Sequence, residues 1–196
     1  NNALGFYTLA CNTEGQNNNA IGHQALYYNT TGEFNNAIGR KALMCNTTGD
    51  HNTAIGWCSL LANTTGDHNT ALGSYALRYN TDGCYNTAIG LCALCGSLSG
   101  DHNFAAGQNA LKANWGGCYN TAIGRCALYS NTTGSRNVAI GSGAFDAAAF
   151  SESENVAIGQ NAMGAVNEDD DGSDVDSNIA IGYGALFGGS MADVDR

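Results

Sequence analysis

The sequence predicts an all-β protein, a parallel β-solenoid of about eleven 17-residue turns, from three observations. A glycine recurs every 17 residues, the residues around it repeat in fixed columns, and the composition lacks the large apolar side chains of a thick globular core. The chain of 196 residues has 27 glycines, no proline and only 12% charged residues. Thin coils that stack many times suit this composition better than one globule does.

The repeat is marked by the glycine that ends an Ala-Ile-Gly triplet, which we number position 0 of each coil. Nine such glycines, from Gly5 to Gly141, follow at steps of 17 residues, and Gly159 and Gly182 follow at steps of 18 and 23. The chain therefore divides into regular solenoid repeats over residues 1–145 and an irregular, acidic, cap-like part with insertions over residues 146–196.

Each coil is expected to contain two short strands and two turns. Positions −4 to −1 read Asn-Thr-Ala-Ile or a close variant, which is a β-branched, alternating segment. An Ala-Leu pair at positions +3 and +4 is expected to form the second strand. An Asn-Thr-Thr-Gly turn then closes the coil through Asx-type hydrogen bonds.

Asparagine stands at position −4 in every coil, which predicts a structural ladder along the rod. Stacked coils place equivalent residues about 4.8 Å apart, so that amides can hydrogen-bond from coil to coil. By the same spacing, eleven coils make a rod roughly 50 Å long. The ladder positions in the regular coils are Asn18, Asn35, Asn52, Asn69, Asn86, Asn103, Asn120 and Asn137.

The alternation of side chains along the strand predicts an oligomer. Ala at position −2 faces one side of the strand, so Thr at −3 and Ile at −1 face the other. If Leu at +4 fills the coil, a stripe of Ile lies outside, and such a stripe rarely stays bare on a soluble monomer. Threefold self-association would cover it, whereas a monomeric solenoid would turn both Ile and Leu inward.

Charge excludes some partners. Residues 1–145 carry six basic and six acidic side chains, whereas residues 146–196 carry eleven acids against Arg196 alone. A neutral-to-acidic surface does not favour nucleic acid, which needs clustered Lys and Arg. The sequence also has no apolar run long enough for a transmembrane helix, so no membrane span is expected.

The repeated unit Asn-Thr-Ala-Ile-Gly-x-x-Ala-Leu resembles the head repeats of YadA-like trimeric autotransporter adhesins. With its Asn-Thr-Thr-Gly turn it is also similar to repeat arrays of phage-type tail fibres. The resemblance covers residues 1–145 and, more loosely, 155–187. It implies a left-handed parallel β-roll that trimerises, and an extracellular adhesin or fibre role. The 17-residue period and the eight cysteines depart from the adhesin heads.

The cysteines fall in columns that suggest bridges between chains. Cys84 and Cys92 stand at the two ends of one strand segment, and Cys118 and Cys126 repeat that spacing. Within one column, cysteines are two coils or about 10 Å apart, beyond the reach of a disulfide. We therefore hypothesise interchain bridges Cys84–Cys92′ and Cys118–Cys126′, against the alternative that the thiols are small apolar fillers.

Ring-bearing residues form a further column at position +12. They are Phe34, His51, His68, Tyr85, His102 and Tyr119. This column, with Trp57, Trp115, Tyr75 and Tyr79 in variable turns, is a candidate surface for glycan or for a neighbouring subunit. The alternative is cross-strand stacking of the rings, which would stabilise the rod. A third hypothesis is a metal site, because Asp-His pairs lie on adjacent coils.

One insertion is a candidate calcium site. Its carboxylates Asp169, Asp171, Asp174 and Asp176 alternate around Gly172, as in oxygen-rich Ca²⁺ loops, although the spaced Glu of an EF-hand is missing. A solvated acidic loop is the alternative. Ca²⁺ is the one cofactor that the sequence suggests.

The function predicted from these features is structural and adhesive. No Ser, His and acid constellation stands out from the repeat, so the chain is not expected to be an enzyme. We expect a rod segment of an extracellular or virion fibre, trimeric, that contacts host or surface glycan or matrix along its side. The alternative is a subunit of a self-assembling extracellular filament whose open end coils stack on the next molecule.

Overall fold

A computed structural model of the chain describes residues 1–147, 151–165 and 176–187. In this part of the chain there is one three-residue strand per coil and no helix, and thus no helix that could cross a membrane. The strands are β1 (Asn2–Leu4), β2 (Asn19–Ile21), β3 (Asn36–Ile38), β4 (Thr53–Ile55), β5 (Thr70–Leu72), β6 (Thr87–Ile89), β7 (Phe104–Ala106), β8 (Thr121–Ile123), β9 (Val138–Ile140), β10 (Val156–Ile158) and β11 (Ile179–Ile181).

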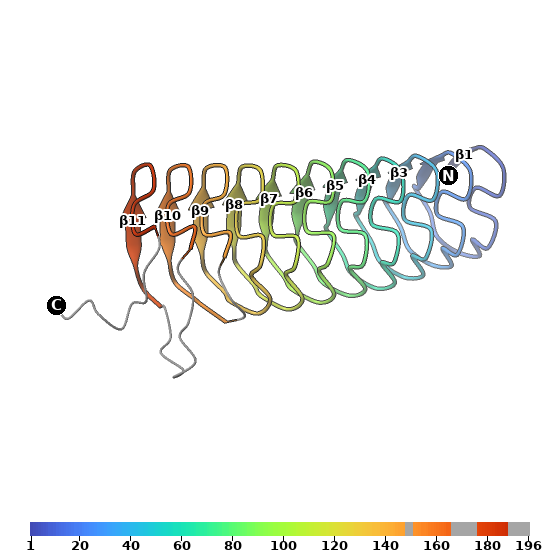
Figure 1. Cartoon of the computed structure of the whole chain (residues 1–196). Helices are drawn as coiled ribbons and strands as arrows, with labels where there is room; N and C mark the ends of the chain where they lie inside the picture. Colours follow the sequence, from blue (N-terminus) through green and yellow to red (C-terminus); the bar gives the residue numbers. More distant parts are fainter. Residues whose placement is uncertain (148–150, 166–175, 188–196) are drawn as a thin grey trace.

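The strands form one parallel sheet in sequence order, β1 to β11, that runs along the whole solenoid (Figure 1). Each strand pairs with the next coil in the same register, so that Ala20 lies beside Ala37 and Ile21 beside Ile38. The longer steps to β10 and β11 keep this register, with Ala157 beside Ala139 and Ala180. The predicted parallel β-solenoid is therefore confirmed.

A thin apolar core fills each coil. In the regular coils from Gly22 on, Leu at position +4 and Ala at positions −2 and +3 are fully buried, as in Leu77, Ala71 and Ala76, and Ser59 is buried at +3 in the coil of Gly56. Phe145 and Met163 take the place of Leu in the coils of Gly141 and Gly159. Because each coil contributes so little apolar volume, the core is stable only as a continuous column through neighbouring coils.

The prediction of a second strand at the Ala-Leu segment is wrong. In every coil the residues at positions +2 and +4 have positive φ, as at Gln24 (60°) and Leu26 (49°), so the segment cannot be extended. It still bonds between coils, because the Leu26 N–H donates to the Ala42 carbonyl at 3.0 Å and the Gln24 N–H to the Phe6 carbonyl at 2.9 Å. Backbone hydrogen bonds between coils therefore continue around the turn, although the turn residues are not extended.

Candidate functional site

The outer face of the sheet carries the Ile stripe that the alternation predicts. Leu lies inside the coil, and the side chains at position −1 point outward and remain partly exposed. In the even-numbered strands β2, β4, β6 and β8 these residues, Ile21, Ile55, Ile89 and Ile123, are 38–40% exposed. One chain alone therefore leaves an apolar stripe partly exposed to water.

The predicted Asn ladder at position −4 is present. The expected pairing of amides occurs from Asn103 onward, at 3.1–3.3 Å, and shorter bonds to the backbone run along the whole ladder. Asn69 is buried; its side-chain oxygen accepts from the backbone N–H of Asn86 at 2.9 Å, and its Nδ2 donates to the Gly83 carbonyl at 2.7 Å. The same two bonds recur along the regular coils. Each side chain therefore satisfies buried backbone groups of the next coil.

A second Asn ladder, at position +7, was missed by the sequence reasoning because it was taken as part of the turn motif. Here the amides bond directly to one another, with Asn46 Nδ2 donating to Asn29 Oδ1 at 2.8 Å and Asn63 Nδ2 to Asn46 Oδ1 at 2.8 Å. Each amide also donates to the glycine carbonyl of its own turn, as Asn46 does to Gly49 at 2.9 Å. The signal that could have found it is a recurring Asn at +7.

Ser97 interrupts this second ladder, and we expect Ser97→Asn to stabilise the protein. Ser97 stands where the other regular coils have Asn, and its buried hydroxyl and the buried Oδ1 of Asn80 lack hydrogen-bond partners. An asparagine would supply a donor to Asn80 and an acceptor for Asn114. The gain should be about 1–2 kcal/mol in the free energy of unfolding, measured by urea denaturation. An unchanged or lower stability would contradict this account of the gap.

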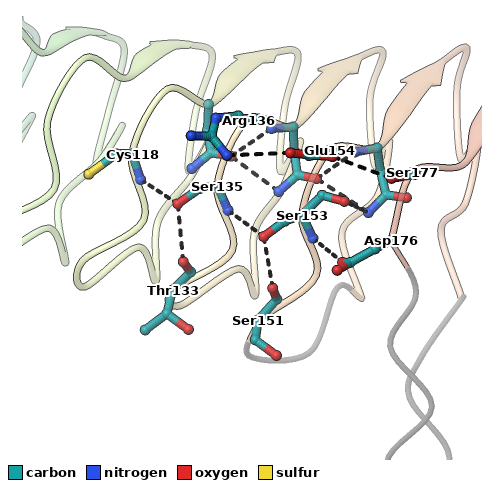
Figure 2. Close-up of polar contacts among 12 residues, drawn as sticks. Cys118, Thr133, Ser135, Arg136, Ser151, Ser153, Glu154, Asp176 and Ser177 are labelled. Carbon is teal, nitrogen blue, oxygen red and sulfur yellow. Dashed lines mark hydrogen bonds and ion pairs between the residues drawn. The ribbon is translucent and has the colours of Figure 1, made fainter.

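Position +11 forms a third ladder, in which a short side chain accepts a hydrogen bond from the backbone of the preceding coil. The Asp50 carboxylate accepts from the Glu33 N–H at 2.6 Å, and the Cys84 sulfur takes the same role for the Asp67 N–H at 3.3 Å. Figure 2 shows the series continuing from Cys118 through Ser135 and Ser153 to Asp176. Beside it, Arg136 pairs with Glu154 at 3.3 Å.

This third ladder explains two of the four cysteines proposed to bridge chains. Cys84 and Cys118 are acceptors in a ladder whose other acceptors are Asp or Ser. Burial raises the pKa of the Cys84 thiol, and neighbouring carboxylates add to that rise, which makes it a weaker nucleophile. Cys92 and Cys126 lie at position +2, beyond the other end of the strand. All eight cysteines are free within the chain, and the interchain bridges stay a prediction.

Cys92 also lies beside Cys95, three residues along the chain. Burial and the neighbouring Cys92 raise the pKa of Cys95 to about 12, so its thiol stays protonated near neutral pH. Cys95 is therefore a buried filler, whereas Cys92 is only partly buried.

The six rings of the +12 column form one continuous stack. Neighbouring centroids from Phe34 to Tyr119 lie 4.8–4.9 Å apart, and the planes differ by 2–7°. Because each ring covers the face of the next, the exposed part of the column consists of ring edges. A sugar stacks on a ring face, so this geometry favours the interpretation of the column as a stabilising ladder over that of a glycan platform.

The structure bears on the Asp-His metal hypothesis and on only one residue of the calcium hypothesis. The carboxylates that precede the His residues are occupied in the +11 ladder, and the described part of the chain contains no group of three His, Cys, Asp or Glu side chains placed to hold a metal ion. Of the proposed calcium ligands, Asp169, Asp171 and Asp174 lie outside the described residues. Asp176 lies within them and accepts from the Ser153 N–H at 2.6 Å.

The exposed aromatic residues of the variable turns separate into two places. Tyr75 and Tyr79 flank Arg78, whose guanidinium carbon lies 4.9 Å from both ring centroids. Trp57 packs against Tyr75, with the two centroids 4.8 Å apart. Trp115 belongs to position +8 instead, where its carbonyl accepts from the Leu98 N–H of the preceding coil. We call Trp57, Tyr75, Arg78 and Tyr79 the Arg78 cluster.

A shallow hollow in the last coils is lined by Asn161, Tyr183, Gly184 and Phe187. Among the described residues, Tyr183 is the one titratable group that lines it. No protein-family model, curated protein or solved structure matches the chain.

Proposed function

We propose that this chain is a rod segment of an extracellular or virion fibre, that it associates as a homotrimer, and that its sides contact host or surface glycan. The observation that carries the proposal is the apolar stripe of position −1 on an unbroken sheet. Leu4 and Ile181, in the end strands, are 69% and 67% exposed, and the central members Ile55 and Ile89 are 38% and 40% exposed. Association of three chains along this stripe would remove it from water.

The interior of the coil supports a mechanical role. Three side-chain ladders and the inter-coil backbone bonds tie each coil to its neighbours, and the described residues include no hinge-like break in the sheet. A rod built in this way transmits force along its axis, while the side chains that vary from coil to coil lie at its surface. This is the arrangement that a spacer with a binding side requires.

Sedimentation equilibrium of the purified chain tests the assembly. We expect a mass of three times 20.2 kDa, and discrete short rods by electron microscopy. Ile55→Glu with Ile89→Glu places charge in the stripe and should give monomers, whereas Thr48→Glu with Thr65→Glu, at exposed turn positions, should leave the trimer intact. A monomeric parent chain would overturn the trimer, and indefinite filaments would favour the self-assembling alternative.

Binding of fluorescent rods to a panel of neutral and acidic saccharides tests the adhesive part separately. Retention on at least one saccharide class is expected. Rods that trimerise but bind none of them would reduce the role to a spacer.

A further inference from the structure

The zero net charge of residues 1–145 hides a separation of charge between the two loops of the coil. The loop that follows the strand, positions +1 to +6, is the C-side loop, and the loop that precedes it, positions +8 to +12, is the N-side loop. Five of the six cations lie on the C-side loop, namely Arg40, Lys41, Arg78, Lys112 and Arg125. All six carboxylates lie on the N-side loop, namely Glu14, Glu33, Asp50, Asp67, Asp82 and Asp101.

The strand separates these two loops on one side of the coil. Five residues lie between position +12 and position +1 of the next unit, whereas position +7 alone separates the two loops on the other side of the coil. Arg78 at +5 is thus four residues from Asp82 at +9, and no ion pair joins these two side chains. The C-side loop of the regular coils is therefore a basic edge of the rod, and the N-side loop an acidic one.

Arg78 is the cation of the basic edge that is held most firmly without a counter-ion. Its guanidinium carbon lies 4.9 Å from the ring centroids of both Tyr75 and Tyr79, so two rings fix its position. Within the described residues no carboxylate pairs with it, and its buried Nε lacks a hydrogen-bond partner. By contrast, Lys112 donates to the Tyr129 hydroxyl at 3.1 Å, and Arg136 of the N-side loop pairs with Glu154.

The rings of the Arg78 cluster differ from those of the +12 stack. The planes of Trp57 and Tyr75 are inclined by 51°, and Trp57 is 46% exposed, so the neighbouring ring does not lie flat against the indole. Tyr79 is also 46% exposed. This cluster therefore offers ring surface next to a fixed guanidinium, whereas the +12 stack offers edges alone.

We propose that the Arg78 cluster binds an anionic saccharide, with the guanidinium of Arg78 holding its carboxylate or sulfate group and Trp57 packing against the sugar ring. A planar guanidinium pairs with two oxygens of such a group at once, and an indole covers the apolar face of a sugar. Arg40 and Lys41 occupy the same edge two coils earlier and add positive potential. The proposal rests on the adhesive function proposed above and names its ligand class.

Isothermal titration calorimetry with the purified chain tests this assignment. The probes are an oligogalacturonate hexasaccharide, a heparin-derived sulfated hexasaccharide and the neutral maltohexaose. We expect binding of at least one anionic probe, weakened by raising NaCl to about 0.5 M, and no comparable binding of maltohexaose. The preferred anionic probe distinguishes a carboxylate ligand from a sulfate ligand.

Variants locate the site. Arg78→Gln should weaken binding of the anionic probe at least about tenfold, the loss expected for a charged hydrogen bond. Trp57→Ala should weaken it several-fold, and Arg136→Gln, a cation on the N-side loop, should leave it within about twofold. Thermal unfolding of each variant verifies that the fold is kept.

Three results would overturn the assignment. They are equal affinity for maltohexaose, unchanged affinity in Arg78→Gln, and equal affinity for a single-stranded DNA hexamer, which would indicate unspecific attraction of polyanions. Binding of neutral saccharides alone would leave the adhesive rod standing while removing this site.

Discussion

Gly73→Ala is expected to lower the free energy of unfolding by about 2–6 kcal/mol, as the sum of backbone strain and steric overlap. Gly73 has a φ of 133°, a conformation that side chains with a Cβ rarely adopt. A Cβ there would lie 2.6 Å from the carbonyl oxygen of Gly90 and 2.8 Å from its carbonyl carbon. Backbone cannot move aside as a flexible side chain can, so the two coils would have to separate locally.

Urea denaturation followed by circular dichroism measures this loss, and Gly116→Ala is its matched control. A Cβ at Gly116 has no heavy atom within 4 Å, so that variant should change stability by less than about 0.5 kcal/mol. Equal stability of the two variants would contradict the spacing of the coils at the glycine column. Since the same close approach recurs along the column, as at Gly22 and Gly56, the result bears on the whole rod.

The repeat in the sequence was sufficient to predict the fold because a solenoid converts a linear period directly into stacking. Position in the repeat determined which residues are neighbours in space, and the structure confirms it for the −4 column, the +12 column and the buried Ala and Leu. Residues far apart in the chain could be paired by counting alone, which an irregular fold does not permit.

Atomic detail within a column could not be predicted in the same way. Leu26 and its equivalents have a positive φ, which is rare for leucine and has no mark in its residue type, so the Ala-Leu segment looked like a strand. The +11 ladder was hidden because Asp, Cys and Ser differ in charge and reactivity. They share a short side chain that can accept one hydrogen bond, and only the backbone geometry reveals that this is what the column requires.

The Arg78 cluster shows a different limit. Trp57, Tyr75 and Tyr79 were chosen from the sequence as variable surface aromatics, and their columns placed them in neighbouring coils. The guanidinium between the two tyrosines depends on the rotamer of Arg78, which a period does not determine. Features that break the repeat are therefore the ones that need coordinates.

Asn69→Ala is expected to lower the free energy of unfolding by about 2–4 kcal/mol, because it leaves a buried donor without a partner and a cavity beside it. The Asn69 side chain is fully buried and is the acceptor for the Asn86 N–H. The Gly83 carbonyl loses one of its two amide donors and keeps Asn80 at 2.9 Å. Most of the loss should therefore come from the Asn86 N–H, which is buried in the packed coil.

The matched control is Asn36→Thr. Asn36 is a part-buried asparagine in β3, and its column holds Thr at Thr53, Thr70 and Thr87. The one side-chain bond it accepts, from Asn19 at 3.1 Å, lies at the surface of the sheet, so this variant should stay within about 0.5 kcal/mol of the parent. Comparison of the two variants by urea denaturation distinguishes a specific loss in the interior ladder from a general cost of removing amides. A similar small loss in both would mean that the −4 ladder contributes little, and that the Leu column alone holds the coils together.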